Sequence, residues 1–444
     1  MPNTYHMVFW EWIEHRTFAS KKTYKPFLNK MNFVFISPHF PHTYWEFCNR
    51  LKQYGVNVLG LADVPYEELS NHLKQSLTEY YRVNNLENYD EVYRAVAFLA
   101  FKYGRIDWIE SNNEYWLEQD ARLRTDFHVT SGLQADEVWT IREKSAMKEF
   151  YAKGGIPTAR QIQCSEGIEA VRKFIEAVGY PVIGKPNIGV GAGGTYKVEN
   201  EDDLQRLFNI GIVINQYVVE EFVTGDICSY DAIIDSHSQP LFESMTVWPP
   251  SIMDIVNRQL DLSYYVAPTM PEQLRLLGRR TVEAFHVKSR FVHLEFFRLD
   301  RDREGLGHQG DFVAREVNMR PAGGYTPDMI NFAHSTDVYR IWADMVAYDK
   351  SQAASSNQHD TGNALSLPWS NEYYCCFASR RDIHRYRHTD EEVRQRYQQQ
   401  MVMSERMPEI LSGAMGQQMF TVRLKTFEEV EEFVNFVHEK ENEE

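Results

Sequence analysis

One lysine and a run of glycines lie between two short apolar segments in the stretch PVIGKPNIGVGAGGTYKV, residues 181–198. Backbone N–H groups of a glycine loop can surround phosphate oxygens, and Lys185 before the loop supplies a positive charge. A merely flexible hairpin would explain the glycines but not a lysine between apolar neighbours. The stretch therefore predicts a phosphate-binding strand–loop–strand, here called the flap. Its loop residues are Gly189, Gly191, Ala192, Gly193 and Gly194.

Three better-known glycine motifs do not fit the flap. Gly189, Gly191 and Gly194 satisfy the G-x-G-x-x-G spacing of a dinucleotide-binding turn, but the β-prone residues 195–198 follow where that turn requires a helix. A P-loop ends in Gly-Lys-Ser/Thr, whereas Lys185 precedes the glycines. The chain also has neither the His-Arg-Asp nor the Asp-Phe-Gly motif of protein kinases.

Carboxylates gather in a second region, where SRFVHLEFFRLD and DFVAREVNMRP read as two strands joined by a polar loop. Residues two apart on a strand face the same side, so Glu316, Asn318 and Arg320 project together, beside Glu295 on the other strand. Apolar neighbours imply burial, and a buried carboxylate needs a cation. The cluster predicts a site for magnesium and polyphosphate. His293 shares the side of Glu295 and is a candidate for contact with substrate, with a satisfied core histidine equally open.

Together, the segments GKPNIGVGAGGT, EEFVTGD, EFF and EVNMRPAGG resemble the ATP-grasp superfamily, over residues 31 to about 440. The nearest group is the carboxylate–amine ligases, which are also similar to the ATP-grasp halves of carbamoyl-phosphate synthase and biotin carboxylase. The resemblance implies a mixed α/β and α+β fold. A Rossmann-like pre-ATP-grasp domain would precede two subdomains that clasp ATP, and a small α+β region would follow.

The resemblance also assigns roles to residues. Lys144 and Lys185 match the two phosphate lysines, and Asp226 matches the acid that contacts the ribose. The hinge that binds adenine through the backbone of Glu221 and Val223 comprises Glu220, Glu221, Phe222 and Val223. The magnesium ligands, with Mn²⁺ as an alternative metal, would be Glu295, Glu316 and Asn318. Arg320 would meet the transferred phosphate or the substrate carboxylate, and Arg320 and Lys185 are the expected catalytic residues.

The residues after Arg320 separate this chain from one group of relatives. Biotin carboxylases continue with a glutamine-valine-glutamate-histidine run, whereas here Pro321, Ala322, Gly323 and Gly324 follow, as in small-molecule ligases. The resemblance therefore implies an enzyme, a ligase that converts a carboxylate into an acyl phosphate and joins it to an amine, or to a thiol. Two alternatives stay open: a non-catalytic nucleotide sensor, and a phosphotransferase that does not ligate. Gly323 is a further candidate for the substrate site.

The elements that would position these residues divide the chain into four regions. Residues 31–125 alternate strands with helices, as in NFVFIS, VNVLGLA and IDWIES, which predicts a parallel sheet. The loop after IDWIES offers Asn113 and Glu114 to a substrate. Residues 126–354 form the predicted ATP-grasp domain, including a helix capped by Ser165. Residues 355–444 follow a polar stretch and read as a small α+β region.

Composition bounds the remaining expectations. A chain of 444 residues allows about three domains. A net charge of −16 argues against a nucleic-acid surface, and no apolar run approaches the roughly 20 residues that cross a bilayer. The five cysteines are scattered, which predicts reduced, buried thiols and a cytoplasmic enzyme. Family resemblance leaves a homodimer open, and the carboxylate and amine substrates are not determined. Residues 1–30 are either an N-terminal helix or an extension before a start at Met31.

Overall fold

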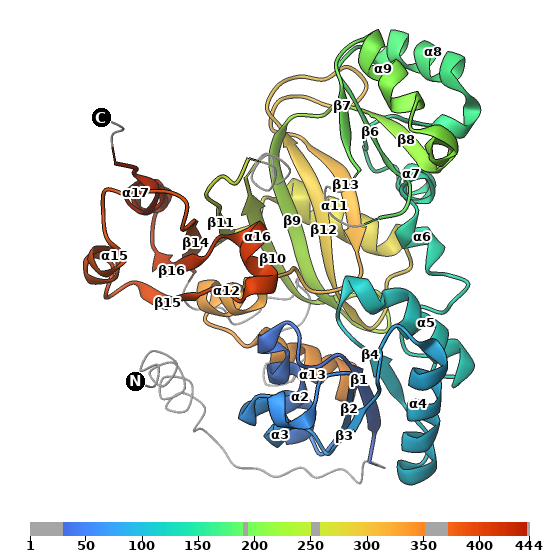
Figure 1. Ribbon diagram of the computed structural model, residues 1–444, viewed down its shortest axis with the longest axis vertical. Helices are drawn as coiled ribbons and strands as arrows, with labels where there is room; N and C mark the ends of the chain where they lie inside the picture. Colours follow the sequence, from blue (N-terminus) through green and yellow to red (C-terminus); the bar gives the residue numbers. More distant parts are fainter. Residues whose placement is uncertain (1–29, 190–193, 250–257, 351–371, 442–444) are drawn as a thin grey trace, which may run out of the picture.

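The computed structural model describes residues 30–189, 194–249, 258–350 and 372–441. Three sheets organise these residues, one with four parallel strands, one with four antiparallel strands and one with eight strands (Figure 1). The N-terminal extension, residues 190–193 of the flap and the polar stretch near residue 355 lie outside the described residues.

The N-terminal domain is a parallel sheet with strand order β3-β2-β1-β4. Its strands are β1 (Asn32–Ile36), β2 (Asn57–Ala62), β3 (Glu79–Arg82) and β4 (Trp108–Glu110), and its helices are α2 (Trp45–Gln53), α3 (Asn71–Ser76), α4 (Tyr89–Tyr103) and α5 (Leu117–Asp126). This agrees with the predicted alternation of strands and helices. Because β1 and β4 are parallel neighbours, the loops that follow them lie at the same edge of the sheet.

The small sheet has the order β5-β8-β6-β7 and carries the flap. It comprises β5 (Gln161–Gln163), β6 (Val182–Pro186), β7 (Tyr196–Val198) and β8 (Tyr217–Glu221), with α8 (Ile168–Val178) and α9 (Glu201–Phe208) beside it (Figure 1). β6 and β7 pair antiparallel, so the flap is the predicted strand–loop–strand. The predicted cap at Ser165 is wrong. Ser165 lies in a 3₁₀ turn, and the residue before α8 is Gly167, whose φ of 91° favours glycine.

The large sheet has the order β13-β12-β9-β10-β11-β14-β16-β15. Its first five strands in the chain are β9 (Gly225–Ile234), β10 (Pro240–Trp248), β11 (Ser263–Ala267), β12 (Arg290–Leu299) and β13 (Phe312–Asn318). On one face, Val292 and Leu294 pack with α7 (Lys144–Lys153) and α11 (Glu272–Ala284). On the other face, Phe291 packs in a core that also holds Phe33 and Trp108 of the N-terminal domain. The shared core therefore brings the N-terminal domain against the face that carries His293 and Glu295.

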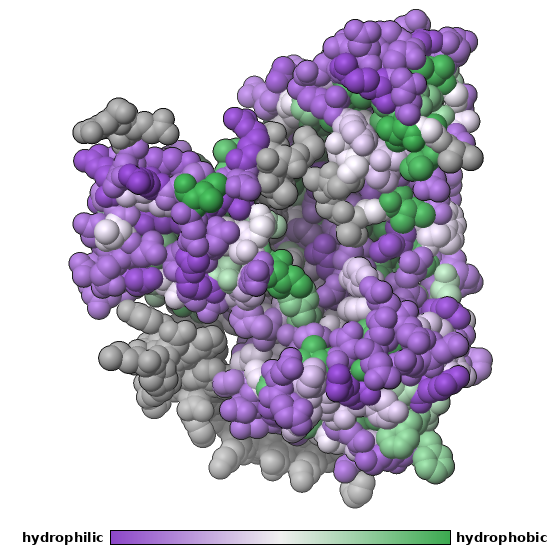
Figure 2. Space-filling view, in the orientation of Figure 1, coloured by the Kyte–Doolittle hydropathy of each residue, from purple (hydrophilic) through white to green (hydrophobic). Residues whose placement is uncertain are grey.

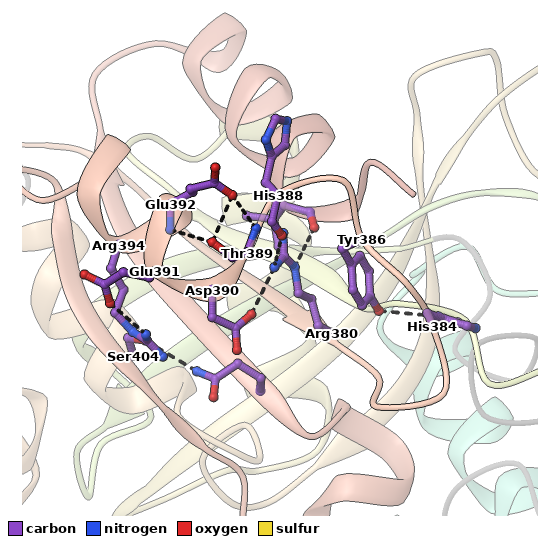
Figure 3. A network of polar contacts seen from close by, with 12 residues as sticks. Arg380, His384, Tyr386, His388, Thr389, Asp390, Glu391, Glu392, Arg394 and Ser404 are labelled. Atoms are coloured by element: carbon purple, nitrogen blue, oxygen red, sulfur yellow. Dashed lines mark hydrogen bonds and ion pairs between the residues drawn. The ribbon is translucent and has the colours of Figure 1, made fainter. Parts of the chain in front are cut away.

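The C-terminal region continues the large sheet instead of forming a sheet of its own. It contributes β14 (Tyr374–Arg380), β15 (Met401–Arg406) and β16 (Gln418–Leu424), with α15 (Asp390–Arg396), α16 (Glu409–Met415) and α17 (Phe427–His438). Buried Arg380 ties these elements together, since it donates to the carbonyls of Val437 and His388 and to Asp390 at 2.7–2.9 Å (Figure 3). Helices α12 (Thr326–His334) and α13 (Val338–Tyr348) connect the region to the hairpin of β12 and β13.

A buried ion-pair network joins the N-terminal domain to the large sheet. The carboxylate of Glu110, at the end of β4, accepts from Arg290 of β12 at 2.6 Å and from Arg124 of α5 at 2.9 Å. Burial alone would raise the pKa of Glu110, but the two guanidinium groups lower it below its usual value. Glu110 is thus ionised and holds the loop after β4 next to the hairpin.

Candidate active site between the small and large sheets

The hairpin of β12 and β13 places two carboxylates directly opposite each other. Glu295 pairs with Glu316, and His293 pairs with Asn318. Partner residues on antiparallel strands project to the same side, so the four side chains share one face. Like charges at directly opposed positions repel, and the pair therefore needs a cation.

Arg315 supplies a cation that the alternation of a regular strand would place on the far side. The register shifts between Glu295 and Phe296, whose partners are Glu316 and Ala314, so Arg315 is the extra residue of a β-bulge. Its guanidinium forms an ion pair with Glu295 and lies 3.9 Å from Glu316. Sequence reasoning missed Arg315 because a bulge leaves no mark in the strand's residue pattern.

The donors at this end of the hairpin fit a hard divalent cation. Among the described residues, no three histidine, cysteine or acidic side chains form a metal-binding group, so the site rests on two carboxylates and one amide. Asn318 is buried, its Oδ1 is within 3.3 Å of Arg320, and its Nδ2 has no hydrogen-bond partner among the described residues. Oxygen donors of this kind suit magnesium.

His293 is held in a buried polar network behind Glu295. Its Nδ1 lies 2.6 Å from Asp231, and its Nε2 lies 3.2 Å from Glu295. Asp231 also accepts hydrogen bonds from Ser229 and Thr246 at 2.7 and 2.9 Å. Through the contact of His293 with Glu295, this network helps to orient the Glu295 carboxylate. Both ring nitrogens of His293 thus have partners, and its contact with a substrate stays a prediction.

Two lysines converge on one carboxylate of the small sheet. Lys148 lies 2.5 Å from Glu220, and Lys185 forms an ion pair with the other carboxylate oxygen. Burial would raise the pKa of Glu220, but the two ammonium groups lower it to about 2. Lys148 was missed, although its position four residues after Lys144 places the two on one face of α7. Glu220 thus holds two cations toward the space between the sheets.

The flap is attached to the start of α7. Asn187 accepts from the backbone N–H of Lys144 and, through Oδ1, from that of Ser145, both at 2.9 Å. Lys144 Nζ donates to the carbonyl of Gly189 at 3.1 Å. Burial lowers the pKa of Lys144, while the charge of Glu316 acts in the opposite direction. These contacts bring flap, helix and carboxylates together. Gly194 follows the gap, and Gly191, Ala192 and Gly193 lie outside the described residues.

The predicted hinge follows β8 and leads into β9. The side chain of Glu221 forms an ion pair with Arg160, which donates to both carboxylate oxygens at 2.8 and 2.9 Å. The backbone N–H of Glu221 also donates to the carbonyl of Arg160 at 2.9 Å, so a base would have to be bound by other backbone groups of residues 221–223. Val223 is buried, and Phe222 is partly exposed, with its ring 5.4 Å from Lys197.

The ribose contact of Asp226 stays a prediction, and the strand register shows which face its side chain occupies. β9 pairs Ser229 with Glu295 but Asp226 with Arg298. Three residues separate Ser229 from Asp226, so alternation places Asp226 on the opposite face from the carboxylates. Asp226 also influences the pKa of Cys228, which packs in the core around α11. The resemblance located the segment but not the face of the strand.

The loop after β4 brings Glu114 to the end of the hairpin. Its carboxylate lies 3.4 Å from Arg320 and 3.8 Å from Arg142. Burial raises the pKa of Glu114, although Arg320 opposes the shift. Asn113 instead accepts from the backbone N–H of Tyr115 at 3.0 Å and starts a 3₁₀ turn. Gly323 is exposed, and its carbonyl accepts from Thr326.

The parts of the chain that carry these groups border one depression. Figure 2 shows a hollow at the centre of this face, with the small sheet above it, the N-terminal domain below and the C-terminal region on the left. In Figure 1, α7, β6 and β8 lie on the upper side, and β4 and α5 lie on the lower side. The arrangement can hold a polyanion and a second charged molecule next to each other.

Comparison with known proteins decides the fold. Residues 143–225 match the family model described as the ATP-binding domain of the carbamoyl-phosphate synthase L chain. The crystal structure of an L-amino acid ligase from Bacillus licheniformis matches with a TM-score of 0.65 at 14% identity, over 91% of this chain and 96% of that one. The chain has the ATP-grasp fold. The biotin carboxylase domain of the 2-oxoglutarate carboxylase of Hydrogenobacter thermophilus, solved with MgADP and bicarbonate, matches with a TM-score of 0.64 at 14% identity, over 90% and 87% of the two chains.

A curated relative agrees with this ATP-grasp assignment. The L-arginine-specific L-amino acid ligase of Bacillus subtilis is 24% identical over 289 residues, which cover 63% of this chain and 67% of the relative. These comparisons confirm the recognition of the ATP-grasp superfamily and the mixed α/β fold, and the similar proteins named above include two L-amino acid ligases. Within the described residues, no helix is both long and apolar enough to span a membrane. All five cysteines are buried and unpaired, as predicted.

Proposed function

We propose that this ATP-grasp protein joins a small carboxylate to an amine at the expense of ATP, through an acyl phosphate. The observation that carries the proposal is the convergence of two groups of residues. Glu316 and Lys185 are among the charges that act on the pKa of Lys144, and Glu316 lies opposite Glu295 on the hairpin. The ion pair Glu114–Arg320 lies at the end of the same hairpin.

The polyphosphate side would work by electrostatics. The two phosphate lysines neutralise the triphosphate from the flap and from α7, and the backbone of Glu221 and Val223 binds adenine. Glu295, Glu316 and Asn318 would hold magnesium, or Mn²⁺, which supplies charge neutralisation at the γ-phosphate when bound. Closing the flap would exclude water, which would otherwise hydrolyse an acyl phosphate.

The chemistry then needs two displacements. A carboxylate oxygen of the substrate attacks the γ-phosphorus, and the bond from phosphorus to the bridging oxygen breaks, so that ADP leaves with the electron pair. The amine nitrogen next attacks the acyl carbon, the bond to the phosphate oxygen breaks, and inorganic phosphate leaves while the nitrogen loses a proton. Neither step requires a covalent bond to the protein.

The pair Glu114–Arg320 supports an α-amino acid as the activated carboxylate. A guanidinium recognises a carboxylate with two parallel hydrogen bonds, and a carboxylate recognises an ammonium group. Arg320 reaches Glu114 at 3.4 Å, which is longer than a good charge-assisted hydrogen bond. A zwitterion between them would give each charge a closer partner. The L-amino acid ligases among the similar proteins favour the same substrate class.

The cellular setting belongs to the same proposal. ATP is the co-substrate, and the five cysteines are buried and free, which suits the cytoplasm. A homodimer is proposed on the similarity to the carboxylase domain of Hydrogenobacter thermophilus, whose structure contains a dimer.

ADP release tests the proposal. The protein is incubated with MgATP and with amino acids and other small carboxylates, singly and in pairs, and the products are identified by mass spectrometry. We expect ADP, phosphate and a condensed product only when both a carboxylate and an amine are present. Glu316→Gln is the inactive control, because it weakens the predicted metal site without adding bulk.

Two other results would replace the proposal. ADP release with a phosphorylated product and no condensation would indicate a phosphotransferase. Tight binding of ATP without turnover in any pair would indicate a nucleotide sensor.

A further inference from the structure

Arg315 is a cation on the carboxylate face of the β12–β13 hairpin that the proposed reaction leaves without a task. It is extruded by the β-bulge onto the face of Glu295 and Glu316, and its side chain is 36% exposed. Bulges recur next to active sites, where they redirect a side chain. We therefore asked what Arg315 could do on the face that carries Glu295 and Glu316.

The opposed carboxylates provide the first part of that reason. Glu295 and Glu316 are 16% and 28% exposed, so their repulsion is only partly screened by water. The guanidinium of Arg315 pairs with Glu295 and lies within 4 Å of Glu316, where it offsets this repulsion. Arg315 thus occupies a carboxylate that the proposed function assigns to magnesium.

The neighbouring lysine provides the second part. Burial lowers the pKa of Lys144, and Arg315 is among the positive charges that lower it further. The two positive charges therefore repel each other. An anion that entered between them would attract both, and a partly exposed arginine on a long stem can turn toward it.

We propose that Arg315 is a further catalytic residue, which holds Glu295 before the metal binds and contacts the γ-phosphate once MgATP occupies the site. The inference rests on the proposed function for its chemical step. In that step the guanidinium stabilises the negative charge of the transferring phosphoryl group. No bond to Arg315 forms or breaks.

The first test measures metal binding, without any carboxylate or amine substrate. Mn²⁺ binding is followed by electron paramagnetic resonance, with a non-hydrolysable ATP analogue either absent or present. In Arg315→Met, Glu295 is free, so we expect Mn²⁺ alone to bind about fivefold more tightly, the gain from losing a partly exposed ion pair. Weaker or unchanged Mn²⁺ binding would overturn the inference.

The second test measures turnover. Arg315→Met should lower kcat roughly a hundredfold while the KM for ATP stays near its original value, because the contact forms mainly as charge transfers. Arg315→Lys keeps the charge but loses the planar fork, so it should recover part of kcat. An unchanged kcat in Arg315→Met would also overturn the inference.

Arg298→Met is the matched control. Arg298 is exposed on the same hairpin. It is the strand partner of Asp226 in the register of β12 and β9, on the face opposite to Glu295. It should change neither Mn²⁺ binding nor kcat. The two tests separate the inference from the proposed function: a wild-type protein that binds Mn²⁺ and the analogue but forms no product would contradict ligation, while the metal-binding result would still decide the position of Arg315.

Discussion

Two mostly buried glutamates of the candidate site have opposite pKa shifts. Glu220 of the small sheet is bound by Lys148 and Lys185, which lower its pKa to about 2 against the effect of burial. Glu114 of the N-terminal domain is equally enclosed, but its arginine neighbours are 3.4 and 3.8 Å away, and burial raises its pKa.

The opposite pKa shifts show that Glu220 has close cation partners within the protein, whereas Glu114 has only more distant ones. Below, the surroundings of Glu220 are called the finished side and those of Glu114 the incomplete side. Glu220 has its full complement of cations, so its role is to hold two lysines in place for phosphate. Glu114 is largely desolvated and its two arginine partners lie farther away, so burial outweighs their effect on its pKa. Under the proposed function, the predicted phosphate side is therefore built in advance, whereas the predicted substrate side would be completed by the substrate.

The largest expected effect follows from breaking the finished side. Lys185→Ala removes one ammonium group from the phosphate site and one partner from Glu220. We expect kcat to fall roughly 10²–10³-fold, as for loss of a group that stabilises transition-state charge. Steady-state ADP release measures the change.

A control variant and a contradicting outcome accompany the Lys185→Ala experiment. Lys173→Ala, on the exposed side of α8, is the control and should keep full activity. Near-normal turnover in Lys185→Ala would contradict the assignment of the phosphate site.

The charge of Glu220 can be tested through the pH dependence of stability. Its pKa is about 2 in the folded chain and about 4.5 in the unfolded chain, so its ionisation stabilises the fold fully above pH 4.5. The contribution is lost as the pH falls through about 2, and it amounts to about 3 kcal/mol. The difference in unfolding free energy between wild type and Glu220→Gln, measured with urea, should therefore shrink from pH 5 to pH 2.

Glu199→Gln, which alters an exposed carboxylate at the end of the flap, is the control for this pH series. If the difference between wild type and Glu220→Gln did not depend on pH, Glu220 would not be the ionised partner of the two lysines.

The smallest of these effects concerns the incomplete side. Glu114→Gln keeps the shape of the side chain but loses its charge, so a substrate ammonium would lose a charge-assisted hydrogen bond. We expect kcat/KM for the activated amino acid to fall by up to about a hundredfold, with the KM for ATP unchanged.

Glu118→Gln is the control, because Glu118 is also 3.8 Å from Arg142 but is 66% exposed. An equal loss with substrates that carry no amino group would show that Glu114 does not bind an ammonium group.

Much of the fold could be predicted because its signals are local. The flap is marked by glycines between apolar runs, and β12 and β13 by β-branched and aromatic residues around a polar loop. Two details could not be predicted from residue type alone. Ser165 has the residue type of a helix cap, but Gly167 provides the positive φ that the chain needs before α8. Asp226 lies in the expected segment, but only the pairing register shows which face it occupies.

The sequence by itself determined the chemical inventory of the site: the flap with Lys185, the opposed acids Glu295 and Glu316, and Arg320 beyond them. These follow from residue type and a spacing of two, which backbone geometry converts directly into a shared face. Only the tertiary structure decided which charges meet. The bulge at Arg315, the pairing of Glu220 with Lys148 and the approach of Glu114 to Arg320 join residues distant along the chain or break the strand's alternation, so sheet register and domain packing, not local sequence, determine them.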